Sequence, residues 1–372
     1  MSQDNPLPHS SPTEEQLCLL GFNHVKGIGA ARVQALLAAF GSATHAWQAQ
    51  PSELRQLGLS EKIVEHFTEV RRRISLPKVW DQLAKQGIHV ITWGDENYPR
   101  RLKEIAQPPP VLYCRGSLLP QDEWAVAVVG TRRTSAYGKR AAEELCSVLA
   151  QNSITVISGL ARGIDSIAHQ TALANNGRTL AVFGCGIDRI YPPENRRLAE
   201  RITQQGGLLS DYPPGTPPDA NNFPPRNRII SGLSIAVVVV EAGQTSGALI
   251  TAKFATDQGR DVFAFPGNVF SPSSKGTNQL IADGAYPLLE PKDILSALQL
   301  EQAPSYQQAQ KVLPENPLEE KIISLLGVEP IHIDELQEKS GIPIETLSAY
   351  LIMMELKGMI QQSGGMNYVI RA

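Results

Sequence analysis

The sequence predicts an α/β protein in which a parallel sheet lies between an N-terminal helical domain and a C-terminal winged-helix domain. Short, continuous apolar segments alternate with helical stretches between residues 124 and 265, as in sheets that are covered on both faces. The segment before the sheet shows apolar residues at helix-like spacing. The final segment shows three helical stretches followed by two short strand-like stretches, which is the outline of a winged helix.

Composition is typical of a globular protein with a sizeable core. The chain has 372 residues, enough for two or three domains, and 42% of them are hydrophobic. No apolar run reaches the ~20 residues of a membrane helix, and the polar N-terminus lacks the features of a signal peptide. We therefore expect a cytoplasmic protein without a membrane contact. The four cysteines lie far apart and form no CxxC pair, so no metal site and no disulfide framework are expected.

The first 86 residues divide into a polar tail and a helical domain. Residues 1–12 are proline-rich and poor in apolar side chains, which indicates disorder. Residues 13–86 are helical, and a glycine turn before one helix resembles a helix-hairpin-helix motif. Backbone N–H groups at such a helix start can bind a DNA phosphate, which makes Lys26, Gly27 and Gly29 secondary phosphate-contact candidates. The alternative is a structural turn between two helices.

Residues 87–299 form the predicted sheet domain, and its first strands are expected at 88–93 and 111–114. The expected strand and helix pairs that follow are 125–129 with 136–151, 155–158 with 164–174, 179–183 with 194–205, and 235–241 with 247–258, before a last strand at 261–265. In open parallel sheets, ligands bind at the carboxyl ends of the strands. The loops after these strands are therefore the first place to look for a binding site.

Several of these loops combine glycines, hydroxyl groups and cations. Glycine lets the backbone approach an anion, arginine can bind phosphate oxygens bidentately, and the helix that follows each loop adds its positive end. The candidate DNA-binding residues on these loops and the following helices are Gly130, Thr131, Arg132, Arg133, Ser158, Gly159, Arg162, Ser246, Gly247 and Lys253. Glu241, at the end of one strand, is the one carboxylate in the presumed cleft that could take part in chemistry, and the alternative is an ion pair with Arg226 or Arg228.

The sharpest basic and aromatic cluster is the sequence FPPRNR, in a turn that runs into a helix. Phe223 could stack on a base while Arg226, Asn227 and Arg228 hold the backbone, which is the combination used by single-strand binders. The alternative places Phe223 in the core and both arginines in solvent. Together with the strand-end loops, this cluster predicts a broad, anion-binding cleft that suits a polyanion.

The C-terminal part begins with a Gln- and Pro-rich linker at residues 300–317, followed by the winged helix at residues 318–372. Its helices are expected at 318–326, 333–339 and 344–357, and its strands at 359–362 and 366–370. This unit carries four Lys or Arg residues against eight Asp or Glu residues. Readers of the major groove use basic or amide side chains. We therefore expect the winged helix to contact protein more readily than duplex DNA.

Common catalytic patterns are missing from the sequence. It contains no GxSxG elbow, no HExxH pair and no Walker lysine loop, and Gly130 lacks the partner glycines of a dinucleotide-binding motif. His169 follows Asp165 by one helical turn and could form a general-base pair. A surface histidine that only forms a hydrogen bond is the favoured interpretation. We therefore predict no catalytic residue, no cofactor and no enzymatic activity.

Five motifs, taken in order, resemble the DprA/Smf family of DNA-processing proteins. They are VGTRRTSAYG, ISGLARGIDSIAHQTAL, FGCGIDRIYPPEN, FPPRNRIISGLS and EAGQTSGALITAKFA, and the resemblance runs from about residue 93 to residue 286. The resemblance implies an extended Rossmann-like core, flanked by a SAM-like or helix-hairpin-helix domain and a winged helix. It also implies sequence-independent binding and protection of single-stranded DNA through the loops at 130–133 and 226–228. Homodimerisation and loading of the recombinase RecA onto DNA taken up in natural transformation are further implications.

Two other functions compete with DNA binding. One is a nucleotide phosphoribohydrolase of the LOG type, which has a related fold and a PGGxGTxxE signature. This chain has EAGQTSGALIT instead, without the paired glycines and the following carboxylate. The other is a transcription regulator that uses the winged helix with a nucleotide as effector, and the acidic third helix counts against it.

Overall fold

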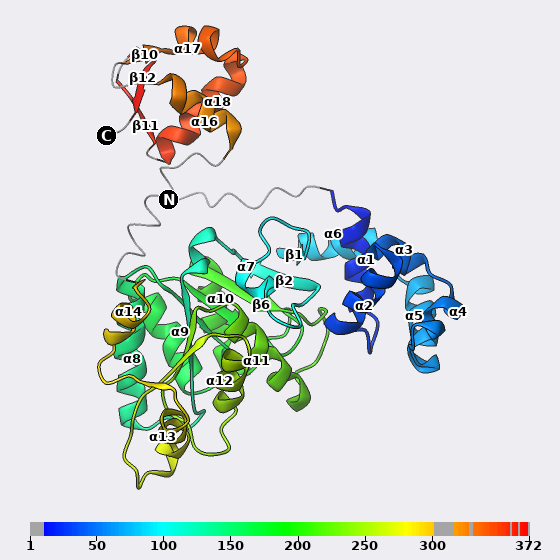
Figure 1. Ribbon diagram of the computed structural model, residues 1–372, viewed down its shortest axis with the longest axis vertical. Coiled ribbons are helices and arrows are strands. Elements are labelled where there is room, and N and C mark those ends of the chain that lie inside the picture. Colours follow the sequence, from blue (N-terminus) through cyan, green and yellow to red (C-terminus); the bar gives the residue numbers. More distant parts are fainter. Residues whose placement is uncertain (1–10, 301–315, 327–329, 358, 364, 371–372) are drawn as a thin grey trace. The chain divides into compact units, whose positions relative to one another are not determined.

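The computed structural model describes residues 11–300, 316–326, 330–357, 359–363 and 365–370 (Figure 1). The described residues up to Leu298 form one compact unit, and those from Gln299 onward belong to a second. Most of the predicted disordered tail and most of the predicted linker lie outside the described residues. None of the helices in the described ranges is both long and apolar enough to span a membrane.

Six helices precede the first strand in the described residues. They are α1 (Glu14–Asn23), α2 (Ala30–Phe40), α3 (Ala43–Gln48), α4 (Pro51–Gln56), α5 (Glu61–Arg73) and α6 (Leu76–Lys85). A capping box at Thr13 starts α1, because the Thr13 hydroxyl accepts from the Gln16 N–H at 3.2 Å. Phe22, Trp47 and Phe67 pack with ring centroids 5.0–5.8 Å apart. This cluster is continuous with buried side chains of the sheet, so helices and sheet share one core.

The main sheet has nine strands in the order β1-β2-β6-β5-β4-β3-β7-β8-β9. They are β1 (Ile88–Thr92), β2 (Val111–Gly116), β3 (Ala125–Val129), β4 (Thr155–Ser158), β5 (Thr179–Val182), β6 (Gly206–Ser210), β7 (Ala236–Val239), β8 (Asp261–Ala264) and β9 (Tyr286–Pro287). Neighbouring strands in the series β6-β5-β4-β3-β7-β8-β9 pair in parallel. The strand β2 pairs antiparallel with both β1 and β6. Every residue of β3, β4, β5 and β7 is buried, which confirms the prediction of a doubly covered parallel sheet.

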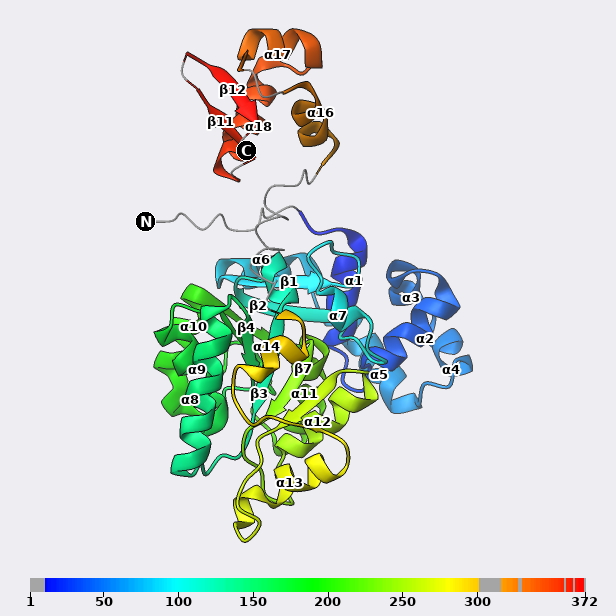
Figure 2. The ribbon, with the colours of Figure 1, turned by 60° about the vertical axis from the view of Figure 1, so that its left-hand side comes forward.

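Helices cover both faces of the sheet (Figure 2). On one face lie α8 (Ala136–Gln151), α9 (Ile164–Ala174) and α10 (Arg196–Gln205), and on the other lie α11 (Phe223–Gly232) and α12 (Ala248–Asp257). The remaining helices of this unit are α7 (Arg100–Lys103), α13 (Lys275–Ala282) and α14 (Asp293–Ala297). The bounds predicted for α8 and α9 are confirmed. Ser135 starts α8, because its hydroxyl accepts from the Gly138 N–H at 3.0 Å.

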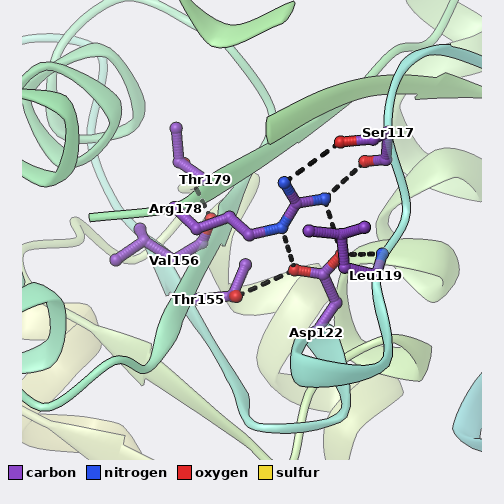
Figure 3. A network of polar contacts seen from close by, with 7 residues as sticks. All are labelled: Ser117, Leu119, Asp122, Thr155, Val156, Arg178 and Thr179. Atoms are coloured by element: carbon purple, nitrogen blue, oxygen red, sulfur yellow. Dashed lines mark hydrogen bonds and ion pairs between the residues drawn. The ribbon is translucent and has the colours of Figure 1, made fainter. Parts of the chain in front are cut away.

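An ion pair joins loops at the amino ends of the parallel strands (Figure 3). Arg178 donates to both carboxylate oxygens of Asp122, from Nε at 2.6 Å and from Nη2 at 2.9 Å. Asp122 also accepts from the Thr155 hydroxyl at 2.9 Å and from the Leu119 N–H at 2.8 Å. The Arg178 and Asp122 side chains are 10% and 8% exposed. The carboxylate therefore depends on protein partners rather than on water.

Replacing Arg178 with methionine is expected to lower the free energy of unfolding by about 3–5 kcal/mol, because Asp122 would remain buried without its counter-ion. Urea unfolding of the full chain measures this loss. The double variant Arg178→Met with Asp122→Leu removes both charges and is expected to be more stable than the single variant. A loss below about 1 kcal/mol in Arg178→Met would show that solvent reaches this ion pair.

The second unit is a small winged helix. Its elements are α16 (Pro317–Leu325), β10 (Ile331–His332), α17 (Ile333–Ser340), α18 (Ile344–Leu356), β11 (Ile360–Gln362) and β12 (Asn367–Ile370). The three strands form an antiparallel sheet in the order β10-β12-β11. The sequence did not predict β10, because two residues are too few to show a pattern. On α18, Ile352 and Met353 are 56% and 51% exposed, so this helix presents apolar side chains to solvent.

Candidate functional site

A pocket of about 700 Å³ lies where the loops after β3, β4, β5 and β7 meet the start of α11. Parallel pairing brings the carboxyl ends of these strands to one edge of the sheet. The predicted contact residues that line the pocket are Gly130, Thr131, Arg132, Arg133, Phe223, Arg226, Asn227, Ser246 and Gly247. Gly159 and Arg162 line a smaller hollow of about 40 Å³ that shares Arg132 and Phe223 with the pocket. Ser158, Arg228 and Lys253 line neither.

The loop at residues 130–133 is held in shape by its backbone. The Thr131 N–H donates to the Glu241 carbonyl at 2.7 Å, and the Thr131 hydroxyl accepts from the Arg133 N–H at 3.2 Å. Gly163 packs against this loop with φ of +77°, and a Cβ there would lie 2.2 Å from the Thr131 carbonyl oxygen. The Arg132 and Arg133 side chains remain exposed, and neither has an ion-pair partner among the described residues. Both guanidinium groups are free to bind an anion.

Two aromatic rings stand beside these arginines. Phe223, at the start of α11, lies with its ring centroid 5.6 Å from that of Tyr191, at an interplanar angle of 31°. The Arg132 guanidinium lies 5.9 Å from the Phe223 centroid. Tyr191 is 43% exposed and lines the pocket, and it was not among the residues predicted from the sequence. Its position in the loop after β5, in the motif FGCGIDRIYPPEN, is the signal that could have identified it.

Arg226 forms part of the pocket floor rather than an exposed arm. It lies inside α11, not in a turn before a helix as predicted, and only 6% of its surface is exposed. Its guanidinium donates to the carbonyl of Gly159 at 3.0 Å and to the carbonyl of Val182. Burial raises the pKa of the Asp165 carboxyl above its usual range, while the positive charge of Arg226 acts in the opposite direction. Most of the hydrogen-bonding capacity of Arg226 is therefore used within the protein.

Arg228 lies on α11 two residues later and connects other parts of the unit. Its Nη2 donates to Asp211 at 2.7 Å, and both side chains are about 15% exposed. The carbonyl of Asp211 accepts from the Asn23 side chain of α1 at 3.1 Å. Arg228 thus links α11 to the loop after β6, which in turn contacts the N-terminal helices. This placement gives it no direct contact with the pocket.

Two other predicted contacts also lie away from the pocket. Ser158 is fully buried, and its hydroxyl donates to the Val128 carbonyl at 2.7 Å. Its side chain therefore has no access to a ligand. Lys253 is exposed on α12, outside the pocket lining. Arg162 lines the smaller hollow and is exposed, but its Nε pairs with the Glu194 carboxylate at 2.5 Å.

Two of the backbone sites that the sequence assigned to anions are occupied by carboxylates of the chain. Glu241 is 2% exposed and accepts from the Ser135 N–H at 2.9 Å, at the start of α8. It makes this contact instead of an ion pair with an arginine of α11. Asp165 accepts from the Gly159 N–H at 3.1 Å and from the Ala161 N–H at 3.4 Å. The loop at 130–133 and the start of α12 keep exposed residues at this edge, among them Arg132, Arg133 and Gly247.

His169 is buried, which corrects the prediction of a surface histidine. It has no exposed surface, and its Nδ1 lies 2.7 Å from the Thr179 hydroxyl oxygen. The Thr179 hydroxyl itself donates to the Val156 carbonyl at 2.7 Å (Figure 3), so Nδ1 carries the proton of the histidine contact. Burial lowers the pKa of His169 to about 3. The ring is neutral at neutral pH and lies outside the pocket lining, so it does not act as a general base there.

Acid is expected to destabilise the protein through His169. The unfolded chain takes up a proton near pH 6.5, whereas the folded protein does so only near pH 3, so stability is lost as pH falls between these values. From pH 7 to pH 5 this contribution is about 2 kcal/mol. Urea unfolding at pH 7, 6 and 5 should show a flatter profile for His169→Gln than for the wild type. The exposed His45→Gln is the control, and an equal flattening in both variants would contradict the assignment.

The secondary candidates Lys26, Gly27 and Gly29 lie in the turn between α1 and α2. Gly29 is the N-cap of α2, Gly27 has φ of +95°, and the Lys26 side chain is exposed. Arg32 donates to the Gly27 carbonyl at 2.5 Å, which fixes the turn. Phosphate binding at this turn stays a prediction. Within the described residues, no cluster of three or more His, Cys, Asp or Glu side chains could hold a metal ion.

Two family models match the chain. Residues 89–299 match the family described as DNA recombination-mediator protein A. Residues 306–366 match the family described as the DprA winged helix domain. The two matched regions correspond to the sheet with its site and to the winged helix, although the second match includes residues outside the described ranges.

Similar proteins are known from several bacteria. Protein Smf of Synechocystis sp. is 36% identical, over 95% of this chain and 98% of that protein. The crystal structure of DNA processing protein A from Streptococcus pneumoniae superposes with a TM-score of 0.66 and 33% identity, and covers 77% of this chain and 98% of that chain. A structure of DNA processing protein A from Helicobacter pylori, described for its single-stranded DNA binding mode, has a TM-score of 0.52 and 31% identity. It covers 57% of this chain and 95% of that chain.

Proposed function

The chain belongs to the DNA recombination-mediator protein A (DprA) family, and on this premise we propose that its pocket binds single-stranded DNA without sequence preference. The observation that carries the proposal is the pair of exposed arginines, Arg132 and Arg133, beside the rings of Tyr191 and Phe223. Unpaired arginines bind backbone phosphates, and aromatic rings stack on bases of any identity. The single-stranded DNA binding mode described for the Helicobacter pylori protein supports the same ligand.

The aromatic pair favours a single strand over a duplex. A base can lie against Tyr191 or Phe223 only when it is not stacked and paired inside a double helix. The pocket is also larger than one phosphate requires, because anion-binding groups extend from Arg133 to the start of α12. A flexible polyanion can reach all of them. These features support a binding protein rather than an enzyme.

We propose further that this protein protects single-stranded DNA and transfers it to the recombinase RecA in recombination and natural transformation, as a homodimer in the cytoplasm. The family description as a recombination mediator supports this role. The winged helix fits a protein contact more closely than duplex DNA, since α18 exposes Ile352 and Met353 and carries Glu345 near its start. RecA loading is testable by following RecA filament formation on single-stranded DNA coated with a single-strand-binding protein, with and without the present protein.

Fluorescence anisotropy with labelled oligo-dT of about 30 nucleotides tests the binding proposal. Tight, salt-dependent binding that resists competition by duplex DNA and by AMP is the expected result. Weak binding that AMP displaces would replace the proposal with a nucleotide pocket of the phosphoribohydrolase type. Displacement by duplex at equal nucleotide concentration would show that the protein does not select single strands.

A further inference from the structure

The most exposed large apolar side chain in the described residues is Phe270. It is 88% exposed, and its neighbour Val269 is 68% exposed. Both lie in the segment between β8 and α13, the yellow segment that projects from the first unit in Figures 1 and 2. This segment follows the carboxyl end of β8, so it leaves the sheet at the same edge as the pocket. Exposing a phenylalanine at this edge has an energetic cost that a ligand contact would recover.

The tip of this segment, residues 268–271, is held in place by its own polar groups. The Asn268 side chain accepts from the Phe270 N–H at 2.9 Å, and the Asn268 carbonyl accepts from the Ser271 N–H at 2.9 Å. Nearby, the Asn278 side chain exchanges two hydrogen bonds with the backbone of Gly267, both at 3.0 Å. The tip is therefore ordered before any ligand arrives. A contact made there loses little conformational entropy on binding.

The tip also adjoins the wall of the pocket. The Gly276 N–H donates to the Ala242 carbonyl at 2.8 Å, and a Cβ on Gly243 would lie 3.3 Å from the Pro272 carbonyl oxygen. Gly243 lines the pocket. Phe270 is only two residues from Pro272, so their Cα atoms are at most about 8 Å apart. A strand that leaves the pocket past Gly243 would meet the tip within a few nucleotides.

The segments on this side of the pocket lack acidic side chains that would repel a polyanion. Residues 242–256 and 262–282, which form the α12 and α13 side, contain no Asp or Glu and only Lys253 and Lys275 as charged residues. An incoming phosphate backbone therefore meets no carboxylate on these segments. An acidic protein segment would find the same charges, but it carries a flat ring only where it has an aromatic residue, whereas every nucleotide of a DNA strand carries one.

We infer that Phe270 is a second stacking platform, which holds a base of the DNA strand as it leaves the pocket past Gly243. This inference rests on the proposed binding of single-stranded DNA and extends it from one pocket to a track along the sheet edge. The phosphates are held first by the arginine loop, and the base at the tip adds a contact only when the strand is long enough. The contact does not depend on base identity, because every base has a flat face.

Strand length provides the test. Phe270→Ala is expected to weaken binding of an oligo-dT of about 20 nucleotides five- to tenfold, near the lower end of base–aromatic stacking, and to leave one of about 6 nucleotides unchanged. Phe270→Trp should retain affinity, and its added fluorescence should be quenched by the longer strand. An abasic strand of the same length should bind wild type and Phe270→Ala equally. Leu57→Ala, an exposed apolar residue in the N-terminal helices, is the control and should show no effect.

The outcomes separate this inference from the proposed function. If wild type binds no oligo-dT, the proposed function itself fails. The proposed function stands if wild type binds oligo-dT and Arg132→Ala weakens that binding. In that case, the track along the sheet edge is wrong if Phe270→Ala binds the longer strand like wild type and Phe270→Trp shows no quenching. If Phe270→Ala instead shifts the protein to a smaller species in sedimentation and weakens both strand lengths equally, the tip contacts a second copy of the chain, and the inference is overturned.

Discussion

Replacing Arg132 and Arg133 together with alanine is expected to weaken the binding of single-stranded DNA by roughly 100-fold at low salt, because two charge-assisted phosphate contacts are lost. The slope of log affinity against log salt should become shallower by about 1.4, since each phosphate contact on a single strand contributes about 0.7. Anisotropy titrations of oligo-dT at four salt concentrations measure both quantities. The free energy of unfolding should change little, because both side chains are exposed and have no ion-pair partner among the described residues.

Lys253 provides the matched control for this experiment. It is an exposed cation on α12, selected from the sequence as a contact, but it lies outside the pocket lining. Lys253→Ala should leave the salt slope within about 0.3 of the wild-type value. If Lys253→Ala changed the slope as much as the double arginine variant, binding would depend on the general charge of the unit and not on the loop at 130–133.

Replacing Arg226 with methionine is expected to act mainly on stability, with a loss of about 3–5 kcal/mol in the free energy of unfolding. The change removes the donor to the carbonyl groups of Gly159 and Val182 and leaves the buried Asp165 without its nearby positive charge. Urea unfolding gives the loss. Whatever folded protein remains should show a nearly wild-type salt slope, because Arg226 is only 6% exposed and its Nε and Nη1 groups donate within the protein.

A second pair of variants keeps this prediction testable if Arg226→Met does not fold. Asp165→Asn in the Arg226→Met background should recover part of the lost stability, because it removes the uncompensated charge. Gly159→Ala should also destabilise the protein, since its Cβ would lie 2.5 Å from the Arg226 Nη2. A stable Arg226→Met protein whose salt slope drops by about 0.7 would show that Arg226 is a phosphate ligand after all.

The helices and strands were predictable from the sequence wherever their burial produces a simple pattern of apolar residues. The central strands are buried on both faces, so their apolar runs are continuous, and α8 and α9 begin and end where predicted. The strand β6 was missed because Gly206 and Gly207 open it, and glycine is depleted in strands. The fold requires glycine there, because a Cβ on Gly206 would lie 1.9 Å from the Thr179 carbonyl oxygen. This close approach is set by β5, which is distant in the sequence, so the residues around Gly206 show no sequence pattern that would predict it.

The place of the pocket was predictable from the sequence, but the roles of its residues were not. The glycine- and arginine-containing loops lie at the sheet edge that carries the pocket, and Arg132, Arg133 and Phe223 line it. Their contact with DNA stays a prediction. Arg226 and Arg228 look equivalent in the sequence, yet one is enclosed by carbonyl groups and the other pairs with Asp211. Which arginine stays free depends on partners that are distant in the sequence. The same holds for Glu241 and Asp165, whose carboxylates accept from backbone N–H groups at the start of α8 and after β4.

Photo-crosslinking of an oligo-dT that carries 5-iodouracil, followed by mass spectrometry of the peptides, tests the central claim most directly. The iodouracil base reacts with aromatic side chains that it contacts, so the site of reaction reports where the strand lies. We predict that the crosslinks fall on Tyr191 and Phe223 and that Arg132→Ala with Arg133→Ala reduces both. Crosslinks confined to the winged helix or to the N-terminal helices, with none on either pocket ring, would contradict the claim that the strand is held at the carboxyl edge of the sheet.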